Sequence, residues 1–440
     1  MIGNIFFIKV LNSKYLLALF LLIFAVLVLY LQSLKAPWVD ECYSYYGVCH
    51  DNFSEFYDSM LTGINFSPPL YFLFNFCIQF VFPTSIEQLR IQSLVFIIIG
   101  IILSFLVSRK MFGTNAAFLG TMLVTSQSNL LLSHAQEARN YAMYFACGAW
   151  VLYMQSLDDD TAKKNKWLTF FAHFCLCQVH YLGIIFSGLV GLSYLVSNNE
   201  QPLMKRIPFP IFGVWIFSLA VYLFFLSQQS SFLGHWSKPI GLKNLLASYN
   251  DSLIMLTFLI PILAVMLPLK PKKNTESYLM EKTCFRPFVI TSVLWFSVPF
   301  IFWVLSHLSP LNLFVDRYFI PKEASIIILV AYGGSFIFQK LPQQNEKTIP
   351  MLGTMVLALT LLSLSSKRFA FGLNKSTNYH HSLIIEESYP KSKQPIILEG
   401  DPKYFPNAYL GRNNYFFLIK DKDLLKTYNQ FSKKINLFKI

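Results

Sequence analysis

Charged residues are scarce in this chain, and their scarcity excludes a water-soluble globular protein. Of the 440 residues only 13% are charged, whereas 54% are hydrophobic. Soluble domains average about 25% charged residues, so the polar surface here is too small to cover a globule in water. The hydrophobic residues also come in runs close to the ~20 residues that a helix needs to cross a bilayer. The sequence therefore predicts a polytopic, all-α membrane protein.

Acidic residues are fewer than basic ones, which gives the chain a net charge of +13. In a soluble protein such an excess would favour nucleic acid as a partner. Here the Lys and Arg residues cluster between the hydrophobic runs, as loop charges do in membrane proteins. We therefore expect no nucleic-acid binding. The seven cysteines lie mostly inside the runs, and Cys42 and Cys49 are interpreted as two buried thiols, with a pair between them left open.

Eleven hydrophobic runs are long enough to be interpreted as spans. They cover residues 11–33, 91–108, 115–133, 141–157, 167–180, 182–197, 209–227, 252–269, 287–306, 322–339 and 348–366. A shorter run, 68–82, decides the topology of everything after it. If it does not cross, nearly all basic clusters of the loops lie on the cytoplasmic face, and if it crosses they lie outside. The positive-inside rule favours the first arrangement, so we expect 68–82 to be a juxtamembrane or re-entrant segment within one long outer loop, 34–90.

This topology predicts two domains. Residues 1–366 form the transmembrane domain, and residues 367–440 lie outside, because the last span runs outward. The composition of the C-terminal segment is rich in Lys, Asn, Tyr and Pro. Two stretches, 394–398 and 415–420, are typical of short strands and 423–431 of a helix, so a small extracytoplasmic α/β domain is expected.

Polar residues that could take part in catalysis or binding gather on the predicted outer face. The first group is Trp38-Val39-Asp40-Glu41, directly after the first span. Two adjacent carboxylates are costly near hydrocarbon, and because neighbouring residues point in different directions their roles would differ. One could act as a general base and the other could orient the loop or bind a metal. A solvated acid pair is the alternative interpretation.

Three further groups supply cations and aromatic rings. Glu137, Arg139 and Tyr141 lie between two spans, and Arg317 and Tyr318 lie before the span at 322–339. Arginine suits phosphate because its planar fork donates two parallel hydrogen bonds; an arginine that snorkels to lipid headgroups is the alternative. Arg90 opens the second span, His180 sits at an outer turn, and Ser67-Pro68-Pro69 precedes the short run.

The order of these features, rather than any one of them, resembles the GT-C membrane glycosyltransferases. An acidic pair after the first span is followed by Pro-Pro-Leu-Tyr, by an arginine opening the second span, by Gln-Glu-Ala-Arg-Asn-Tyr at 136–141, by His-Tyr at 180–181 and by Arg-Tyr at 317–318. Family 39 is the class it most resembles, with the protein O-mannosyltransferases, the aminoarabinose transferases of lipid A and their bacterial relatives. The resemblance covers roughly residues 10–340.

The resemblance implies a catalytic site on the outer face of the inner membrane. Asp40 would be the base or acceptor-orienting residue, with Glu41 as its catalytic neighbour. Donor and lipid phosphate would be bound by a set of residues that the family places around the cavity: Arg90, Glu137, Arg139, Tyr141, His180, Arg317 and Tyr318. Ser67 departs from the Lys or His often found before Pro-Pro. A divalent metal at Asp40 and Glu41 stays open, because two carboxylates alone do not establish one.

The function so implied is transfer of a sugar from a polyprenyl-phosphate donor to a lipid, glycan or protein acceptor, with inversion. A transporter or flippase of lipid-linked glycans is the alternative from another class. It would require ionisable residues near the bilayer midplane and related halves, and the sequence shows neither. A membrane protein without catalysis would tolerate alanine at Asp40, Arg139 and Arg317 together. The sequence does not name the sugar, the acceptor or the polyprenol.

Overall fold

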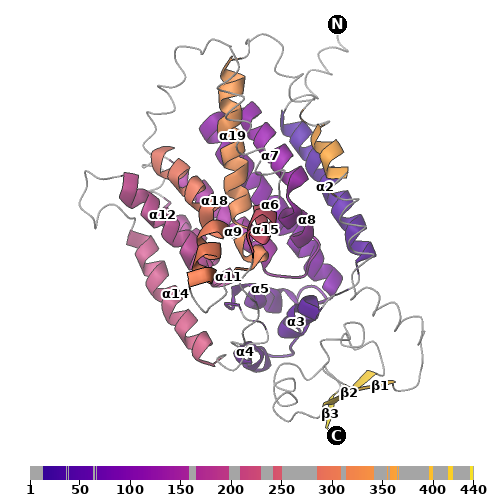
Figure 1. Ribbon diagram of the computed structural model, residues 1–440. Helices are drawn as coiled ribbons and strands as arrows, with labels where there is room; N and C mark the ends of the chain where they lie inside the picture. The colour runs from indigo at the N-terminus through magenta and orange to yellow at the C-terminus, as the bar shows by residue number, and fades with distance from the viewer. Residues whose placement is uncertain are drawn as a thin grey trace.

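The structure is an elongated bundle of helices with a group of short helices at one end (Figure 1). It is a computed structural model that describes residues 13–35, 37, 39–62, 65, 67–157, 165–197, 209–228, 241–249, 285–308, 314–340, 354, 357–363, 365, 396–399, 415–419 and 437–439. The long helices of the bundle are α2 (Ser13–Leu34), α6 (Ile86–Phe112), α7 (Thr114–Gln127), α9 (Tyr141–Gln155), α11 (Lys166–Val179), α12 (Gly183–Ser197), α14 (Phe209–Gln228), α18 (Phe285–Leu308) and α19 (Lys322–Lys340).

Four of these helices are long and apolar enough to cross a membrane. They comprise Tyr15–Leu34 in α2, Ile86–Phe112 in α6, Ile211–Gln228 in α14 and Pro287–Leu308 in α18. The all-helical, multi-pass prediction is thereby confirmed in its coarse form. The predicted number of eleven spans stays a prediction, because run 252–269 and most of 348–366 lie outside the described residues.

The predicted span 115–133 is divided in the structure. Helix α7 ends at Gln127, and the short helix α8 (Asn129–His134) begins after Ser128, whose backbone is extended. The Ser128 hydroxyl accepts a hydrogen bond from the amide of Leu131 at 3.1 Å, which is a side-chain cap for a new helix. The polar stretch 126–129 is consistent with this break, but the apolar residues on either side led to the prediction of one continuous span.

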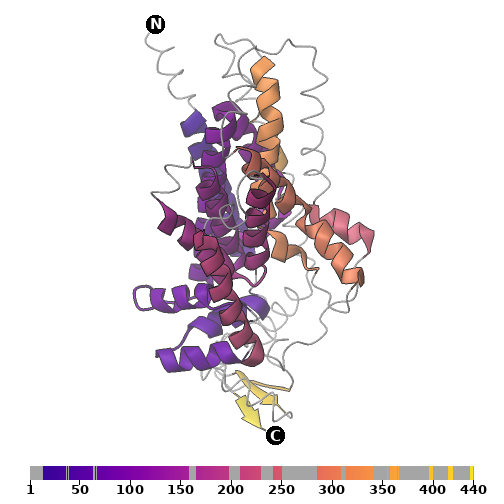
Figure 2. The ribbon, with the colours of Figure 1, turned by 90° about the vertical axis from the view of Figure 1, so that its left-hand side faces the viewer.

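The short run 68–82 forms α5 (Leu70–Ile78), a helix of nine residues. At 1.5 Å per residue it is roughly 14 Å long, about half of the hydrocarbon thickness of a bilayer. It is therefore too short to cross, as its sequence predicted. With α3 (Val39–Val48) and α4 (Phe53–Leu61) it lies at the end of the bundle where α2 ends and α6 begins, and a second view places these helices at the same end (Figure 2).

The centre of the bundle is packed closely around α6, α7 and α19. Helix α6 contacts α7 and α9, and α19 lies against α7. The approach of α7 to α19 depends on Gly120, because a Cβ there would lie 2.5 Å from the carbonyl oxygen of Ile327 and 2.9 Å from the amide nitrogen of Ala331. The turn between α6 and α7 depends on Gly113, whose φ of 89° is readily adopted by glycine alone.

The C-terminal segment contains a small parallel sheet in the order β1-β2-β3. The strands are β1 (Ile396–Glu399), β2 (Tyr415–Ile419) and β3 (Leu437–Lys439). Both predicted strands are found, and β3 was not predicted. The helix predicted at 423–431 lies outside the described residues, so the α/β domain itself stays a prediction. The strands lie beyond α3 and α4 at the same end of the molecule (Figures 1 and 2).

Candidate active site

The two adjacent acids begin a helix rather than lying in a loop. Asp40 and Glu41 occupy the first turn of α3, where the helix dipole favours negative charge. The side chain of Asp40 is 16% exposed, whereas that of Glu41 is fully buried. The structure therefore separates the pair into one carboxylate that can meet a ligand and one that cannot. Trp38 lies outside the described residues.

Asp40 lies between two arginines that come from distant parts of the chain. Its Oδ2 is 3.8 Å from Nη2 of Arg139, in the turn between α8 and α9, and 3.4 Å from Nη1 of Arg317, in the short 3-10 helix η2 (Asp316–Phe319). Charge-assisted hydrogen bonds of this type are usually about 2.7–2.9 Å long. The two pairs are therefore loose, and an anion entering between the guanidinium groups could replace the carboxylate as their partner.

Arg139 is held in place by hydrogen bonds to one backbone carbonyl and two side chains. Its Nη1 donates to the carbonyl oxygen of Asp40 at 3.0 Å, to the hydroxyl of Ser44 at 3.3 Å and to Oδ1 of Asn65 at 3.4 Å. Burial lowers the pKa of Arg139, but the charge of Asp40 together with the contacts of Tyr141 and Tyr71 outweighs burial and raises it. Its Nε is buried and has no hydrogen-bond partner among the described residues. A fixed, charged guanidinium with an unused donor is suited to binding phosphate.

Glu41 is occupied by a buried contact with Arg90. Its Oε1 and Oε2 accept from Nε and Nη2 of Arg90 at 2.8 and 2.7 Å, and Oε1 also accepts from the amide of Ala138 at 2.9 Å. Arg90 in turn donates through Nη1 to the carbonyl oxygens of Gln32 and Lys35 at 3.2 and 2.8 Å. We call Glu41, Arg90 and these backbone partners the buried clamp. It joins α2, α3, α6 and the turn that carries Arg139.

Glu137 forms a second ionic group beside the clamp. Its Oε1 accepts from Nζ of Lys35 at 3.1 Å, and its Oε2 is 3.0 Å from Nδ1 of His134. Burial raises the pKa of Glu137, but the charge of Lys35 and the contact with His134 outweigh burial and lower it well below its usual value. The carboxylate thus remains ionised and ties the end of α2 to the turn before α9.

Aromatic rings form a wall around the two arginines. The Tyr141 ring centre lies 5.8 Å from the Arg139 guanidinium carbon and 5.7 Å from that of Arg317. The ring centre of Tyr318 lies 6.0 Å from the guanidinium carbon of Arg317 and 4.7 Å from the ring centre of His180. The Nδ1 of His180 accepts from the amide of Leu182 at 3.2 Å, so its proton is on Nε2 when the ring is neutral. The flat faces of these aromatic rings suit a planar or sugar-like ligand that binds next to the two guanidinium groups.

The Pro-Pro segment is fastened to the same site. Nδ2 of Asn140 donates to the hydroxyl of Ser67 at 3.2 Å and to the carbonyl oxygen of Val179 at 2.8 Å. The segment before α5 is therefore held next to the residue that follows Arg139, and the end of α11, just before His180, is held with it. Ser67 is placed beside the site as a small hydrogen-bonding residue.

All nine residues predicted from sequence are thus grouped at one end of the bundle, but in two layers. Asp40, Arg139, Tyr141, His180, Arg317 and Tyr318 form one connected group. Glu41, Arg90 and Glu137 lie behind it in ionic contacts of their own. Sequence reasoning missed the supporting residues Gln32, Lys35, Ser44 and Asn65. His134 and Asn140 belong to the polar stretch 134–141 that carries Glu137 and Arg139, but the sequence assigned them no role.

A divalent metal between Asp40 and Glu41 does not fit this arrangement. Both oxygens of Glu41 already accept hydrogen bonds from Arg90, and the Asp40 carboxylate faces two guanidinium groups. Within the described parts of the chain, no group of three or more His, Cys, Asp or Glu side chains could hold a metal ion. No step of the chemistry below is assigned to a metal.

Comparison with known proteins gives a clear result only at the level of structure. No family model matches the chain, and no curated protein matches its sequence. Among solved structures, the crystal structure of ArnT from Cupriavidus metallidurans bound to undecaprenyl phosphate is similar with a TM-score of 0.62 and 12% sequence identity. The similarity covers 96% of this chain and 89% of that one.

The crystal structure of the same ArnT in the apo state is similar with a TM-score of 0.59 and 12% identity, over 96% of this chain and 88% of that one. At this identity the comparison establishes the fold. It is the membrane-embedded GT-C fold predicted by the order of the sequence motifs. Because nearly the whole chain is covered, the resemblance is not confined to one helical hairpin.

Proposed function

We propose that this chain is a membrane glycosyltransferase that moves a sugar from a polyprenyl-phosphate donor to an acceptor on the outer face of the membrane. The observation that carries the proposal is the Asp40 carboxylate in loose contact with Arg139 and Arg317, which lie on separate segments of the chain. An acid between two cations at the end of a helical bundle provides both a proton acceptor and a phosphate site. The ArnT fold supports a lipid-linked donor, since that protein was crystallised with undecaprenyl phosphate.

The two arginines would bind the donor phosphate and stabilise its charge as it leaves. When the bond from the anomeric carbon to the phosphate oxygen breaks, negative charge develops on the phosphate and positive charge on the sugar. Guanidinium groups that are already fixed and partly shielded from water stabilise such charge with little reorganisation. Arg317, with 29% of its side chain exposed, is the more accessible of the two. Tyr141, His180 and Tyr318 would shape the space for the sugar.

Asp40 would then act as the general base. With the phosphate bound to the arginines, its carboxylate is released from their charge and can accept the proton of the acceptor hydroxyl or amine. The acceptor atom attacks the anomeric carbon from the face opposite the phosphate, so the anomeric configuration inverts. One bond forms, one breaks, the proton passes to Asp40 and the polyprenyl phosphate departs. No covalent intermediate with the protein is needed.

Glu41, Arg90 and Glu137 are assigned positioning roles in this proposal. Glu41 accepts a hydrogen bond from the amide of Ala138 and so joins the start of α3 to the turn before α9. Asp40 directly precedes Glu41, and Arg139 directly follows Ala138. The clamp therefore sets the distance between the base and the phosphate-binding arginine. Glu137 would support the same turn through Lys35. This assignment refines the roles that the sequence alone suggested, in which Glu41 is catalytic and Arg90 and Glu137 bind substrate.

The proposed site faces outward, and the C-terminal segment lies on the same side. The positive-inside rule favours a cytoplasmic location for the loop that contains Arg109 and Lys110. These residues lie in the last turn of α6, at the opposite end from Arg90. The strands β1 to β3 lie near α3 and α4 (Figure 2), which supports an extracytoplasmic location for residues 367–440.

Mass spectrometry of polyprenyl-phosphate sugars and envelope glycans tests the function in cells. In a strain without this protein, one polyprenyl-phosphate sugar should accumulate and one glycan, lipid or protein should lose that sugar. The wild-type gene should restore the profile and the Asp40→Asn variant should not. Unchanged profiles would contradict the proposal. Translocation of a lipid-linked glycan by reconstituted protein without bond cleavage would instead support a flippase.

A further inference from the structure

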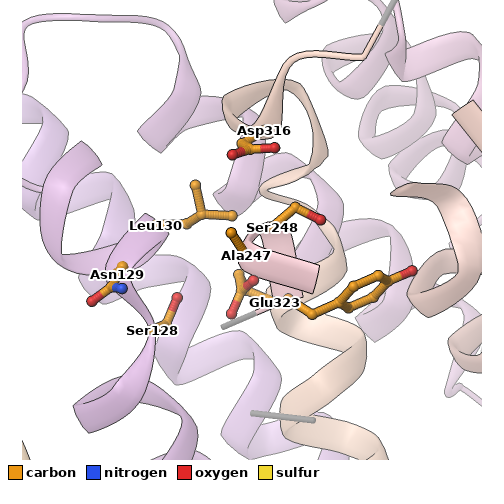
Figure 3. Close-up of a pocket in the computed structure, with 8 residues that line it drawn as sticks. Ser128, Asn129, Leu130, Ala247, Ser248, Asp316 and Glu323 are labelled. Carbon is orange, nitrogen blue, oxygen red and sulfur yellow. The ribbon is translucent and has the colours of Figure 1, made fainter. Parts of the chain in front are cut away.

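A second acidic site contains Asp316 and Glu323, which come before and after Arg317 in the sequence. It is a cavity of about 210 Å³ where four segments meet. Its walls come from the break between α7 and α8, from the end of α15 (Leu242–Tyr249), from Asp316 and from Glu323 in the first turn of α19. Figure 3 shows Asp316 and Glu323 at opposite sides of this space, with Ser128 and Ser248 among the residues around it.

Glu323 presents an unused acceptor to this cavity. The residue is only 1% exposed, and its Oε1 accepts from Nζ of Lys322 at 2.7 Å. Its Oε2 is buried and has no hydrogen-bond partner among the described residues. A buried carboxylate oxygen without a donor is costly, and the cost is larger for a charged group than for a neutral one. A ligand that donates a hydrogen bond in the cavity would remove this cost.

The ionisable residues around the cavity comprise two acids and one lysine, which is one basic group fewer than would balance the acids. Asp316 and Glu323 each carry one negative charge, whereas Lys322 carries one positive charge, and its Nζ already lies 5.7 Å from the ring centre of Tyr249. Burial raises the pKa of Asp316, although Lys322 lowers it. This is the direction expected for a carboxylate whose charge is incompletely compensated. The described residues thus favour a ligand with a single positive charge.

The size of the cavity favours an organic cation over a bare metal ion. Liquid water occupies about 30 Å³ per molecule, so the space would hold roughly seven waters. Calcium and magnesium take about six to eight oxygen ligands in close geometry, whereas the described lining of the cavity offers only two carboxylates. A primary ammonium group, with three N–H donors on a short carbon chain, matches both the charge and the missing donor.

We propose that this cavity is a binding site for a primary alkylammonium group, held between Asp316 and Glu323. Two sources carry this chemistry, a small free amine and the ethanolamine headgroup of a membrane lipid. The site contains none of the residues that contact Asp40, but Asp316 is the direct neighbour of Arg317. An occupied cavity therefore adjoins the proposed phosphate site without depending on the reaction proposed there.

Ligand-induced thermal stabilisation of the purified full-length protein in detergent tests this site. Ethanolamine is titrated at constant ionic strength and compared with choline and with sodium chloride. Ethanolamine should raise the midpoint of unfolding in a saturable way. Choline has the same charge but no N–H donor, so we expect it to bind about tenfold more weakly, the equivalent of one charge-assisted hydrogen bond. An equal response to sodium chloride would overturn the proposal.

Two variants locate the effect. Glu323→Gln and Asp316→Asn should each weaken ethanolamine binding by about tenfold or more. Asp40→Asn, which also removes one negative charge but outside the cavity, should retain the wild-type affinity. If Glu323→Gln does not yield folded protein, Asp316→Asn decides, because Asp316 is not paired with Lys322. Wild-type affinity in Asp316→Asn would show that the ethanolamine is bound elsewhere.

Lipid nanodiscs then distinguish the two sources. If the site takes a lipid headgroup, discs of phosphatidylethanolamine should abolish the response to added ethanolamine, and discs of phosphatidylcholine should preserve it. If the site takes a free amine, both discs should preserve the response. Loss of the response in both discs would contradict the proposal, because phosphatidylcholine offers no primary ammonium group to occupy the cavity.

Discussion

At the scale of single residues, adjacent acids are assigned opposite roles by their surroundings. Asp40 is loosely paired and partly exposed, whereas Glu41 is buried in close contact with Arg90. The sequence could predict that neighbouring side chains point apart. It could not predict which acid meets Arg90, because the two residues are 49 positions apart and either carboxylate could have turned inward.

This difference predicts that replacing Glu41 lowers stability much more than replacing Asp40. Glu41→Gln leaves the buried Arg90 without its charge partner, and breaking a buried pair in this way costs about 3–5 kcal/mol. Asp40→Asn removes only loose contacts and should change stability by less than about 1 kcal/mol. Thermal unfolding of both variants in detergent measures the difference. Joint replacement of Glu41 and Arg90 by Met should recover part of the loss, since no charge is then stranded. Equal midpoints for Glu41→Gln and wild type would contradict the buried clamp.

Glu137 should make the protein sensitive to acid. Its pKa in the folded state is held below that of the unfolded chain by Lys35 and His134, despite burial. The unfolded state therefore binds the proton first, and stability that is present above about pH 4.5 is lost as the pH falls toward the folded pKa. Unfolding midpoints measured between neutral and acidic pH should fall less steeply in Glu137→Gln than in wild type. Identical slopes would show that Glu137 does not contribute.

At the scale of helices, the spacing of apolar residues predicted where helices lie better than where a helix is interrupted. The ends of α9 and α11 lie close to their predicted limits, whereas α6 extends beyond its predicted run 91–108 at both ends and α5 is shorter than the run 68–82. The break at Ser128 was not predicted, because a cap of one hydroxyl acts within a stretch that is otherwise apolar. The same break supplies a wall of the acidic cavity. Local capping thus determined a feature that hydrophobicity could not show.

The contact between α7 and α19 predicts a sensitive glycine. In Gly120→Ala the new methyl group would meet the backbone of Ile327 and Ala331, so the helices must separate. Overpacking of this kind typically costs about 1–3 kcal/mol. Gly213→Ala in α14 is the matched control, since a Cβ there meets nothing within 4 Å. The variant at 120 should unfold at a clearly lower temperature than wild type, and the control should not. A Gly120→Ala protein as stable as its control would argue against this helix contact.

At the scale of the whole molecule, the order of motifs along the chain predicted the fold and the grouping of the site. Residues near positions 40, 139, 180 and 317 meet at one end of the bundle, as the resemblance implied. The supporting network could not be predicted, because Gln32, Lys35 and Asn65 act through backbone carbonyls or single partners that have no sequence pattern.

The proposed topology predicts which positions can be labelled from outside. Because α5 does not cross, residues before and after it should lie on the same face. In a cysteine-free background, Asp51→Cys and Pro83→Cys should both react in intact cells with a maleimide that cannot cross the membrane. Lys110→Cys should react only after the membrane is permeabilised. All three positions are exposed in the structure. Labelling of Lys110→Cys in intact cells would contradict the topology.

The most direct test of the account is cleavage of the donor by the purified protein. Wild-type protein, Asp40→Asn and Arg317→Lys are incubated with a polyprenyl-phosphate sugar and the acceptor identified in cells, and the released polyprenyl phosphate is measured. We predict that Asp40→Asn lowers the rate by about 10²-fold or more, as for loss of a general base, with unchanged folding. Arg317→Lys should slow the reaction less, since one charge remains but the fork is lost. Transfer by Asp40→Asn at the wild-type rate would contradict the central role of this carboxylate.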